Sequence, residues 1–191
     1  LNQISVEMLK KTDDIVENWL ISSPDPNISY GKKCNPLKIE IVVRGYLSGH
    51  SYRLYKSGCR NICGNILSDN MKENEKFKKP IITPTTKADI GNHDQDISPN
   101  DIFLRNILDR KSYEKLHFIS LELFKRGSEI ASKSGLILVD TKYEFGLDFE
   151  NNIILIDEIH TPDSSRYFYL DSYEYLQANN LKQKQISKEV F

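Results

Sequence analysis

The sequence has no long hydrophobic run, few cysteines and no excess of basic residues. No apolar stretch approaches the ~20 residues that a membrane-spanning helix needs, so we expect no membrane partner. The 26 basic and 27 acidic residues give a formal net charge of -1, which argues against a broad nucleic-acid-binding surface. Cysteine occurs only as Cys34, Cys59 and Cys63, and nothing resembles a secretory signal. We therefore expect a reducing, cytoplasmic location.

Several well-known catalytic and metal-binding motifs are also missing. The sequence has no G-x-x-x-x-G-K-[ST] phosphate loop and no G-x-S-x-G nucleophile elbow. Cys59 and Cys63 lack a second Cys or His pair at zinc spacing, which favours a structural role for these thiols. Walker-type nucleotide hydrolysis, serine hydrolysis and a zinc-finger site are therefore disfavoured.

The composition is that of a folded chain. Hydrophobic residues make up 39% and aromatic residues 10% of the 191 residues, enough for a core in one or two domains. Apolar residues at helical spacing from Ile4 to Trp19 predict an amphipathic first helix, which Ser22–Pro26 ends. The β-branched segment Lys38–Leu47 predicts a buried strand, and Ser48–Ser57 predicts a short helix that stops at Gly58.

The second half of the sequence alternates between further helices and strands. The charged segment Ser68–Lys79 predicts a surface loop, and Ser98 followed by a proline predicts a helix start. A second helix is expected from near Ser112 to Gly135. Two strands, Leu136–Phe145 and Ile153–Ile159, flank a turn-forming segment and predict a β-hairpin, and the tail from Asp171 is expected to be helical. These elements predict an α+β fold with antiparallel strands.

The hairpin carries the most informative polar residues. Asp140, Lys142 and Glu144 alternate along one strand and should point the same way, while Asp157 interrupts the apolar run of the next strand. Such residues form either an ordinary polar face or a site for a hard cation such as Mg²⁺, which prefers carboxylate oxygens. A shared cation requires Asp157 to face an even-numbered residue of the first strand, because a slip of one residue reverses its direction.

Two loops and one strand end offer anion-binding groups. Thr83–Asp96 contains Lys87, His93 and Asp94 around a glycine, and Thr161–Arg166 ends in an arginine that can bind phosphate bidentately. Arg44 follows the apolar core of its strand. Each feature alone also fits a polar turn or a surface arginine.

Taken together, four segments resemble the SAICAR synthetase (phosphoribosylaminoimidazole-succinocarboxamide synthase) family, in the order and spacing of that family. The segments are Val42–Gly49 (VVRGYLSG), Pro80–Ser98 (PIITPTTKADIGNHDQDIS), Gly135–Gly146 (GLILVDTKYEFG) and Leu155–Arg166 (LIDEIHTPDSSR). The resemblance implies a two-lobed fold of the ATP-grasp or kinase-like kind, with an antiparallel sheet and flanking helices. It also implies an ATP-dependent ligase that joins L-aspartate to carboxyaminoimidazole ribonucleotide through an acyl phosphate, giving SAICAR, ADP and phosphate in purine biosynthesis.

The resemblance also implies a role for each matching residue. Glu144 and Asp157 correspond to Mg²⁺ ligands, Lys142 to a phosphate or acyl-phosphate contact, and Asp140 to a group that orients that lysine or the substrate. Arg44 and Arg166 correspond to anchors for the phosphate of the nucleotide substrate. The remaining assignments are Lys87 and Asp94 near the reacting carboxylate, Asp163 and Ser165 in the substrate loop, and Glu40 beside the ATP adenosine.

The sequence departs from the family pattern in two places. The family commonly has serine directly after the glycine at position 49, whereas this sequence has His50, which makes His50, when protonated, or Ser51 the candidate contact for the substrate phosphate. The glycine- and lysine-containing β-rich lobe that covers the ATP phosphates is not found before Leu1. We expect residues 1–37 to be the end of that lobe with a linker, and residues 38–191 to be an ATP- and substrate-binding domain with a shortened C-terminus. Such a chain should bind ATP poorly on its own.

Two other functional classes stay open from the sequence. A kinase-like phosphotransferase would use the same metal hairpin and nucleotide cleft. A non-catalytic regulatory module derived from the ligase would fit the missing lobe. The partners expected for the ligase are small molecules, and the sequence is compatible with a homo-oligomer.

Overall fold

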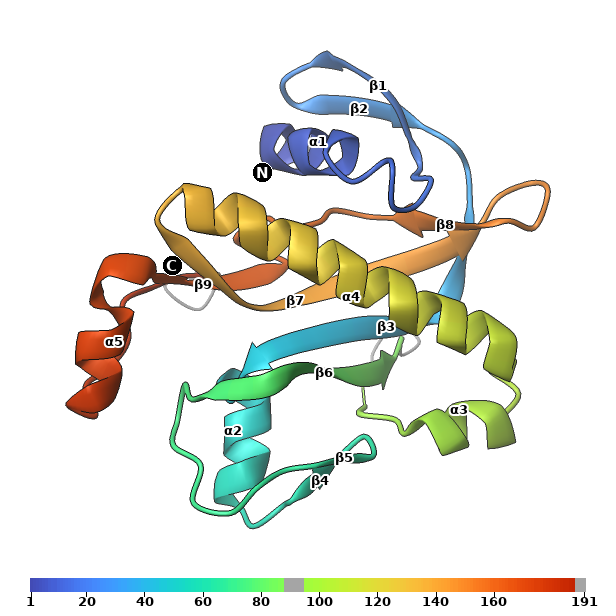
Figure 1. The fold of residues 1–191 in the computed structure, drawn as a ribbon. Helices are drawn as coiled ribbons and strands as arrows, with labels where there is room; N and C mark the ends of the chain where they lie inside the picture. Colours follow the sequence, from blue (N-terminus) through green and yellow to red (C-terminus); the bar gives the residue numbers. More distant parts are fainter. Residues whose placement is uncertain (88–94, 188–191) are drawn as a thin grey trace.

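An antiparallel sheet of six strands forms the centre of the computed structural model, which describes residues 1–87 and 95–187 (Figure 1). The strand order is β10-β9-β7-β3-β6, and β8 also pairs with β7. The two central strands are β3 (Asn35–Tyr46) and β7 (Leu136–Leu147), and β6 (Lys76–Thr86) forms one edge. The others are β8 (Ile153–Ile156), β9 (Ser165–Tyr169) and β10 (Gln185–Ile186). The predicted α+β class with an antiparallel sheet is confirmed.

The long helix α4 (Arg110–Lys133) crosses one face of the sheet (Figure 1). The helix begins at Asp109, whose carboxylate accepts a hydrogen bond from the backbone N–H of Ser112 (2.9 Å), as expected of a helix cap. Its buried residues recur every three or four positions and join the main core with Ile41 and Tyr143 of the sheet. The opposite face of β3 and β7 is therefore left to carry polar side chains.

The N-terminal region differs from the prediction. The helix α1 spans only Asn2–Lys10. The segment Ser22–Pro26 was expected to end that helix, but it lies largely within strand β1 (Leu20–Asp25). Strand β1 pairs with β2 (Ile28–Gly31). The Thr12 hydroxyl donates to the carbonyl of Met8 (2.9 Å), a local bond that competes with further helix. The apolar period to Trp19 nevertheless indicates burial, because Met8, Ile15 and Trp19 pack against the main core.

The shorter elements largely follow the sequence signals. Helix α2 (Gly49–Lys56) and helix α3 (Pro99–Leu104) begin where predicted, and α5 (Leu170–Ala178) occupies the tail. The strands β4 (Asn61–Ile62) and β5 (Asn65–Ile66) form a small hairpin. The predicted loop to Lys79 is too long, because β6 already begins at Lys76. No helix in the described part of the chain has the length and apolarity to cross a membrane.

One edge of β7 is shared by two strands, and this arrangement positions the site. β8 pairs with residues 144–147 of β7, and β9 pairs with residues 136–141. Residues 157–164 connect the two strands, and we call this segment the 157–164 bend. The bend lies beside Lys142, whose backbone N–H donates to the carbonyl of Ser164 (3.1 Å). The predicted strand Ile153–Ile159 was therefore too long, because it stops at Ile156, where the bend begins.

Candidate functional site

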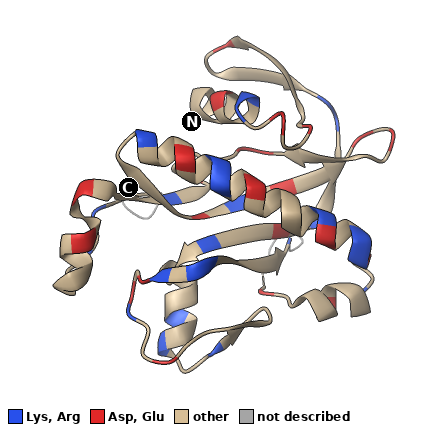
Figure 2. Cartoon of the chain, viewed as in Figure 1, with Lys and Arg blue, Asp and Glu red and all other residues tan. Residues whose placement is uncertain are grey.

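A row of charged side chains crosses the polar face of the two central strands. In the register of β3 and β7, Glu40 lies opposite Glu144, Arg44 lies opposite Asp140, and Lys142 lies opposite Val42. Residues of equal parity on a strand share a face, so this pairing gathers five charged groups on one side of the sheet. Figure 2 shows acidic and basic residues together on these neighbouring strands. The predicted shared face of Asp140, Lys142 and Glu144 is thus confirmed.

At one end of the row, two arginines flank Asp140. Arg44 is buried, and its Nη1 lies 3.3 Å from Asp140 Oδ2 while its Nε donates to Thr83 Oγ1 (2.8 Å). Arg166 Nε lies 4.0 Å from Asp140 Oδ1, and Arg166 Nη1 donates to Ser48 Oγ (2.7 Å). Burial lowers the pKa of Arg44, opposed by the charge of Asp140. A single carboxylate thus orients two guanidinium groups, which is an anion-binding arrangement.

At the other end, two lysines meet two glutamates. Lys142 Nζ lies 3.0 Å from Glu144 Oε1 and 3.2 Å from Glu40 Oε1, and Lys87 also forms an ion pair with Glu144. Burial raises the pKa of Glu144, but both lysines outweigh it and bring that pKa to about 2. Burial likewise raises the pKa of Glu40, and the adjacent Glu144 raises it further against the effect of Lys142. Glu144 is therefore held as a carboxylate.

Asp157 lies beside this cluster because strand β8 ends directly before it. Glu144 pairs with Ile156, so a continued β8 would place Asp157 opposite the odd-numbered Tyr143 and on the wrong face. The strand stops at Ile156, and Asp157 adopts a left-handed backbone with φ of 62°. Burial raises the pKa of Asp157, and the carboxyl group of Glu144 raises it further through its charge and a hydrogen bond. The predicted register requirement was wrong, because the bend re-aims the residue.

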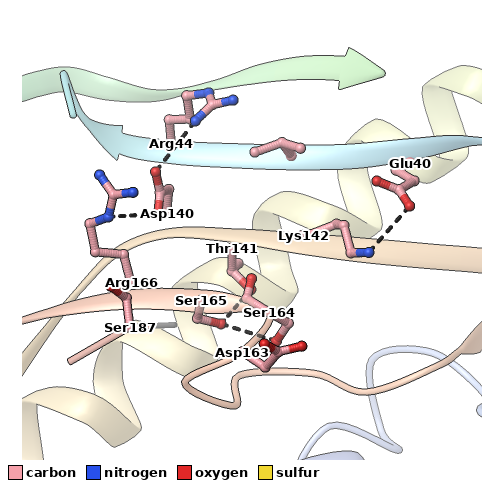
Figure 3. A pocket seen from close by; sticks show the side chains of 11 residues that line it. Glu40, Arg44, Asp140, Thr141, Lys142, Asp163, Ser164, Ser165, Arg166 and Ser187 are labelled. Carbon is pink, nitrogen blue, oxygen red and sulfur yellow. Dashed lines mark hydrogen bonds and ion pairs between the residues drawn. The ribbon is translucent and has the colours of Figure 1, made fainter. Parts of the chain in front are cut away.

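A cavity of about 270 Å³ lies along this row (Figure 3). Its walls come from β3, β7, the end of the bend and the start of β9. Two of the lining residues, Thr141 and Ser165, hydrogen-bond to one another through their hydroxyls (2.8 Å). The lining residues are Glu40, Val42, Arg44, Asp140, Thr141, Lys142, Asp163, Ser164, Ser165, Arg166 and Ser187. Seven of the predicted site residues thus line one cavity, and the ion pair of Glu144 with Lys142 ties Glu144 to it.

Arg166 also borders a second cavity of about 170 Å³ at the start of helix α2. Ser48, Gly49, Arg53 and Lys182 are among its other lining residues. Gly49 has φ of 55°, and a Cβ there would lie 2.5 Å from Arg166 Nη1. Only glycine combines this backbone with that close approach. The start of α2 and Arg166 therefore border a common space, whose lining has three basic residues and one acidic residue, Glu73. Such a space is suited to an anion.

Outside the first cavity and the lysine–carboxylate cluster beside it, three predicted contacts remain. His50 Nε2 lies 2.7 Å from Asp96 Oδ2, so the imidazole faces a carboxylate. The Ser51 hydroxyl is buried and donates to the carbonyl of Ser48 (2.8 Å). Asp94 lies outside the described residues. The roles of all three in substrate binding stay predictions.

Sequence reasoning missed two hydroxyl groups that hold the arginines. Ser48 holds Arg166, and Thr83 holds Arg44, although both residues lie within the segments quoted above. Ser48 carries a signal of its own, because serine directly before a helix start is a preferred cap position. Thr83 carries none, because its partner lies 39 residues away and is set by the pairing of β3 with β6.

Two carboxylates of the site can bind one divalent cation, provided that a ligand supplies further oxygen atoms. Glu144 and Asp157 offer two adjacent carboxylates, the donors that Mg²⁺ prefers. Within residues 1–87 and 95–187, no group of three or more His, Cys, Asp or Glu side chains can hold a metal ion. Phosphate oxygens and water would therefore complete the coordination, as is usual for Mg²⁺ with nucleotides.

Comparison with known proteins gives a consistent result. The sequence model of the family described as SAICAR synthetase matches residues 1–191. The phosphoribosylaminoimidazole-succinocarboxamide synthase of Flavobacterium psychrophilum is 55% identical over 189 residues, which are 99% of this chain and 60% of that protein. The chain thus spans about 60% of the length of such curated relatives.

Solved structures of the same kind share the fold. SAICAR synthase from Saccharomyces cerevisiae complexed with SAICAR superposes with a TM-score of 0.78 at 25% identity, over 94% of this chain and 70% of that one. A SAICAR synthetase in complex with ADP gives a TM-score of 0.79 at 24% identity, over 100% of this chain and 70% of that one. The predicted fold family is confirmed.

Proposed function

Because this chain belongs to the SAICAR synthetase family, we propose that it carries the substrate- and cation-binding face of an ATP-dependent carbon–nitrogen ligase. The reaction condenses L-aspartate with carboxyaminoimidazole ribonucleotide and gives SAICAR, ADP and phosphate. The observation that supports this most is the row of charges on β3 and β7, with an arginine pair at one end and a lysine–carboxylate cluster at the other. The two ends suit a substrate phosphate and a nucleotide triphosphate, respectively.

The reaction needs an activated carboxylate. A carboxylate is a poor electrophile, so its oxygen attacks the γ-phosphorus of ATP, which forms an acyl phosphate and releases ADP. The amine of aspartate then attacks the acyl carbon, loses a proton and expels phosphate, which leaves the new amide. Mg²⁺ bound by Glu144 and Asp157 would offset negative charge on the transferring phosphoryl group.

The lysines have two successive partners in this proposal. In the structure, Lys87 and Lys142 neutralise Glu144. When nucleotide phosphates arrive, both ammonium groups turn to phosphate oxygens, which leaves Glu144 free for the cation. The high pKa of Lys142, raised by Glu144 and Glu40 against burial, keeps this side chain a cation throughout. Lys142 therefore stabilises charge and does not act as a base.

The nucleotide substrate is placed with its phosphate at the second cavity and its imidazole ring in the first. Arg166 borders both cavities and so marks the junction between phosphate and ribose. Asp140 and Ser48 hold Arg166 in position beside Arg44, and Asp163 and Ser165 line the ring end. The structure of the yeast relative that holds SAICAR supports this choice of ligand.

The test is ADP release by the purified full-length protein in the presence of ATP, Mg²⁺, carboxyaminoimidazole ribonucleotide and aspartate, with each component omitted in turn. We expect release that requires aspartate and forms SAICAR. ADP release that persists without aspartate and yields a stable phosphorylated product would favour the phosphotransferase instead. Calorimetric titration with the ribonucleotide alone checks the binding half, which we expect Arg166→Met to abolish.

A further inference from the structure

The 157–164 bend is anchored at its centre by a buried histidine on the far side of the sheet from the site. Tyr143 lies between Lys142 and Glu144 on β7, so its side chain points to the opposite face, where it joins the main core. His160 Nε2 is hydrogen-bonded to Tyr143 Oη (2.7 Å), and the two rings meet edge to face at 75°. The bend therefore sends one side chain through to the helix-covered face while its ends serve the site.

The space for the His160 ring is specified by α4. A Cβ at Gly127 would lie 2.5 Å from Cε1 and 2.6 Å from Nε2 of His160, so only glycine leaves room for the imidazole. The His160 backbone is left-handed, with φ of 55°, and its carbonyl accepts a hydrogen bond from Tyr167 Oη (2.7 Å). A helix, two strands and the bend thus meet at one residue.

The imidazole is neutral in this position. His160 is 2% exposed, and burial lowers its pKa to about 4. Loss of the hydrogen bond to Tyr143 would leave the buried Nε2 of His160 without a partner, which costs free energy. The contact between the two rings is therefore directional as well as apolar. Packing of the ring against Gly127 and its bond to Tyr143 restrain the imidazole, whose Nδ1 is buried without a hydrogen-bond partner among the described residues.

We propose that His160 is a positioning residue, which acts from the core to fix the bend that carries Asp157 to Glu144 and Ser164–Arg166 to the two cavities. Its direct effect is geometric and does not depend on any ligand. Its effect on nucleotide and cation binding rests on the function proposed above.

The first test is amide hydrogen exchange of the unliganded chain, followed by NMR. The Lys142 amide reports on the bend because it donates to Ser164 O. In His160→Phe, which keeps a ring but loses the hydrogen bond, we expect this amide to exchange at least ~10-fold faster while amides of α4 keep their protection. His160→Gln, which can place a polar atom near the position of Nε2, should restore most of the protection.

Two further variants keep the proposal testable if His160→Phe does not fold. Tyr143→Phe removes only the hydroxyl and should accelerate hydrogen exchange of the Lys142 amide. His117→Phe, at an exposed histidine of α4, is the matched control and should leave it unchanged. Unchanged exchange of the Lys142 amide in both Tyr143→Phe and a folded His160→Phe would overturn the proposal.

The second test measures Mn²⁺·ADP affinity by calorimetry on the same variants of the full-length protein. We expect roughly 10-fold weaker binding in Tyr143→Phe and His160→Phe, with a melting temperature lowered by only a few degrees. Affinity equal to wild type would contradict the positioning role. If the wild-type full-length protein binds no Mn²⁺·ADP, the proposed function fails while the exchange measurement still decides the anchoring by His160.

Discussion

The two halves of the site are built by different rules. The β3–β7 row is held by regular strand pairing, so its side chains follow the period of two and alternate between faces. The 157–164 bend breaks that period with two left-handed residues, Asp157 and His160, and is held by contacts to distant elements. Regular pairing places charges in a line, whereas the bend brings a carboxylate to a position that the line alone cannot reach.

The largest effect is expected from removing the carboxylate of Glu144, which belongs to the regularly paired half of the site. Glu144→Gln keeps the shape of the side chain but loses one of the two proposed cation ligands and the partner of both lysines. We expect ligase turnover to fall by roughly 100-fold or more, because charge stabilisation at a transferring phosphoryl group is lost. Steady-state ADP release measures this, with Glu114→Gln on the exposed face of α4 as control. Turnover of Glu144→Gln near that of wild type would remove the metal assignment.

A second prediction concerns the stability of the row. Arg44→Met leaves the Asp140 carboxylate buried beside only one arginine, so we expect a loss of roughly 3 kcal/mol in the free energy of unfolding. Urea denaturation followed by circular dichroism measures it. The double variant Arg44→Met/Asp140→Leu should regain part of the loss, because no unpaired charge remains. A loss below ~1 kcal/mol in the single variant would show that the pair is not the constraint we describe.

The junction between row and bend can be tested at Gly49. Gly49→Ala should cost about 1 kcal/mol through its left-handed backbone and should also displace the Arg166 guanidinium. Gly135→Ala is the matched control, because Gly135 is also left-handed but has no neighbour within 4 Å of an added Cβ. We expect only Gly49→Ala to weaken ribonucleotide binding in calorimetry. Equal affinity of the two variants would argue against an anion at the start of α2.

The smallest expected effect is on the pH dependence of stability. The pKa of Glu144 is about 2 in the folded chain, against an ordinary value of 4.5, so its contribution is present above pH 4.5 and is lost as the pH falls toward 2. The raised pKa values of Glu40 and Asp157 act in the opposite sense over the acidic range. Urea denaturation at pH 5.5 and pH 3 gives the free energies of unfolding of wild type and Glu144→Gln. We expect the difference between the two proteins to be smaller at pH 3 by on the order of 1 kcal/mol. The same difference at both pH values would contradict the charge cluster.

The comparison also explains what the sequence could predict. The face shared by Asp140, Lys142 and Glu144 follows from alternation, and the strands follow from apolar periods. Ser98 marks the start of α3, and Gly135 marks the end of α4. The first helix was predicted too long because apolar spacing reports burial and not hydrogen bonding. The position of Asp157 was predicted from the wrong rule, since a strand continued through residue 157 would have turned it away. Thr83 and Tyr143 acquire their roles only through partners far along the chain.

The central claim is that the bend brings Asp157 to Glu144 so that the two carboxylates share one cation. Diffraction from crystals grown with Mn²⁺ and ADP, collected at a wavelength where manganese scatters anomalously, locates that ion directly. We predict one manganese peak bonded to an oxygen of each carboxylate and to phosphate oxygens of ADP. A peak bonded to only one of the two carboxylates, or located away from both, would contradict the account.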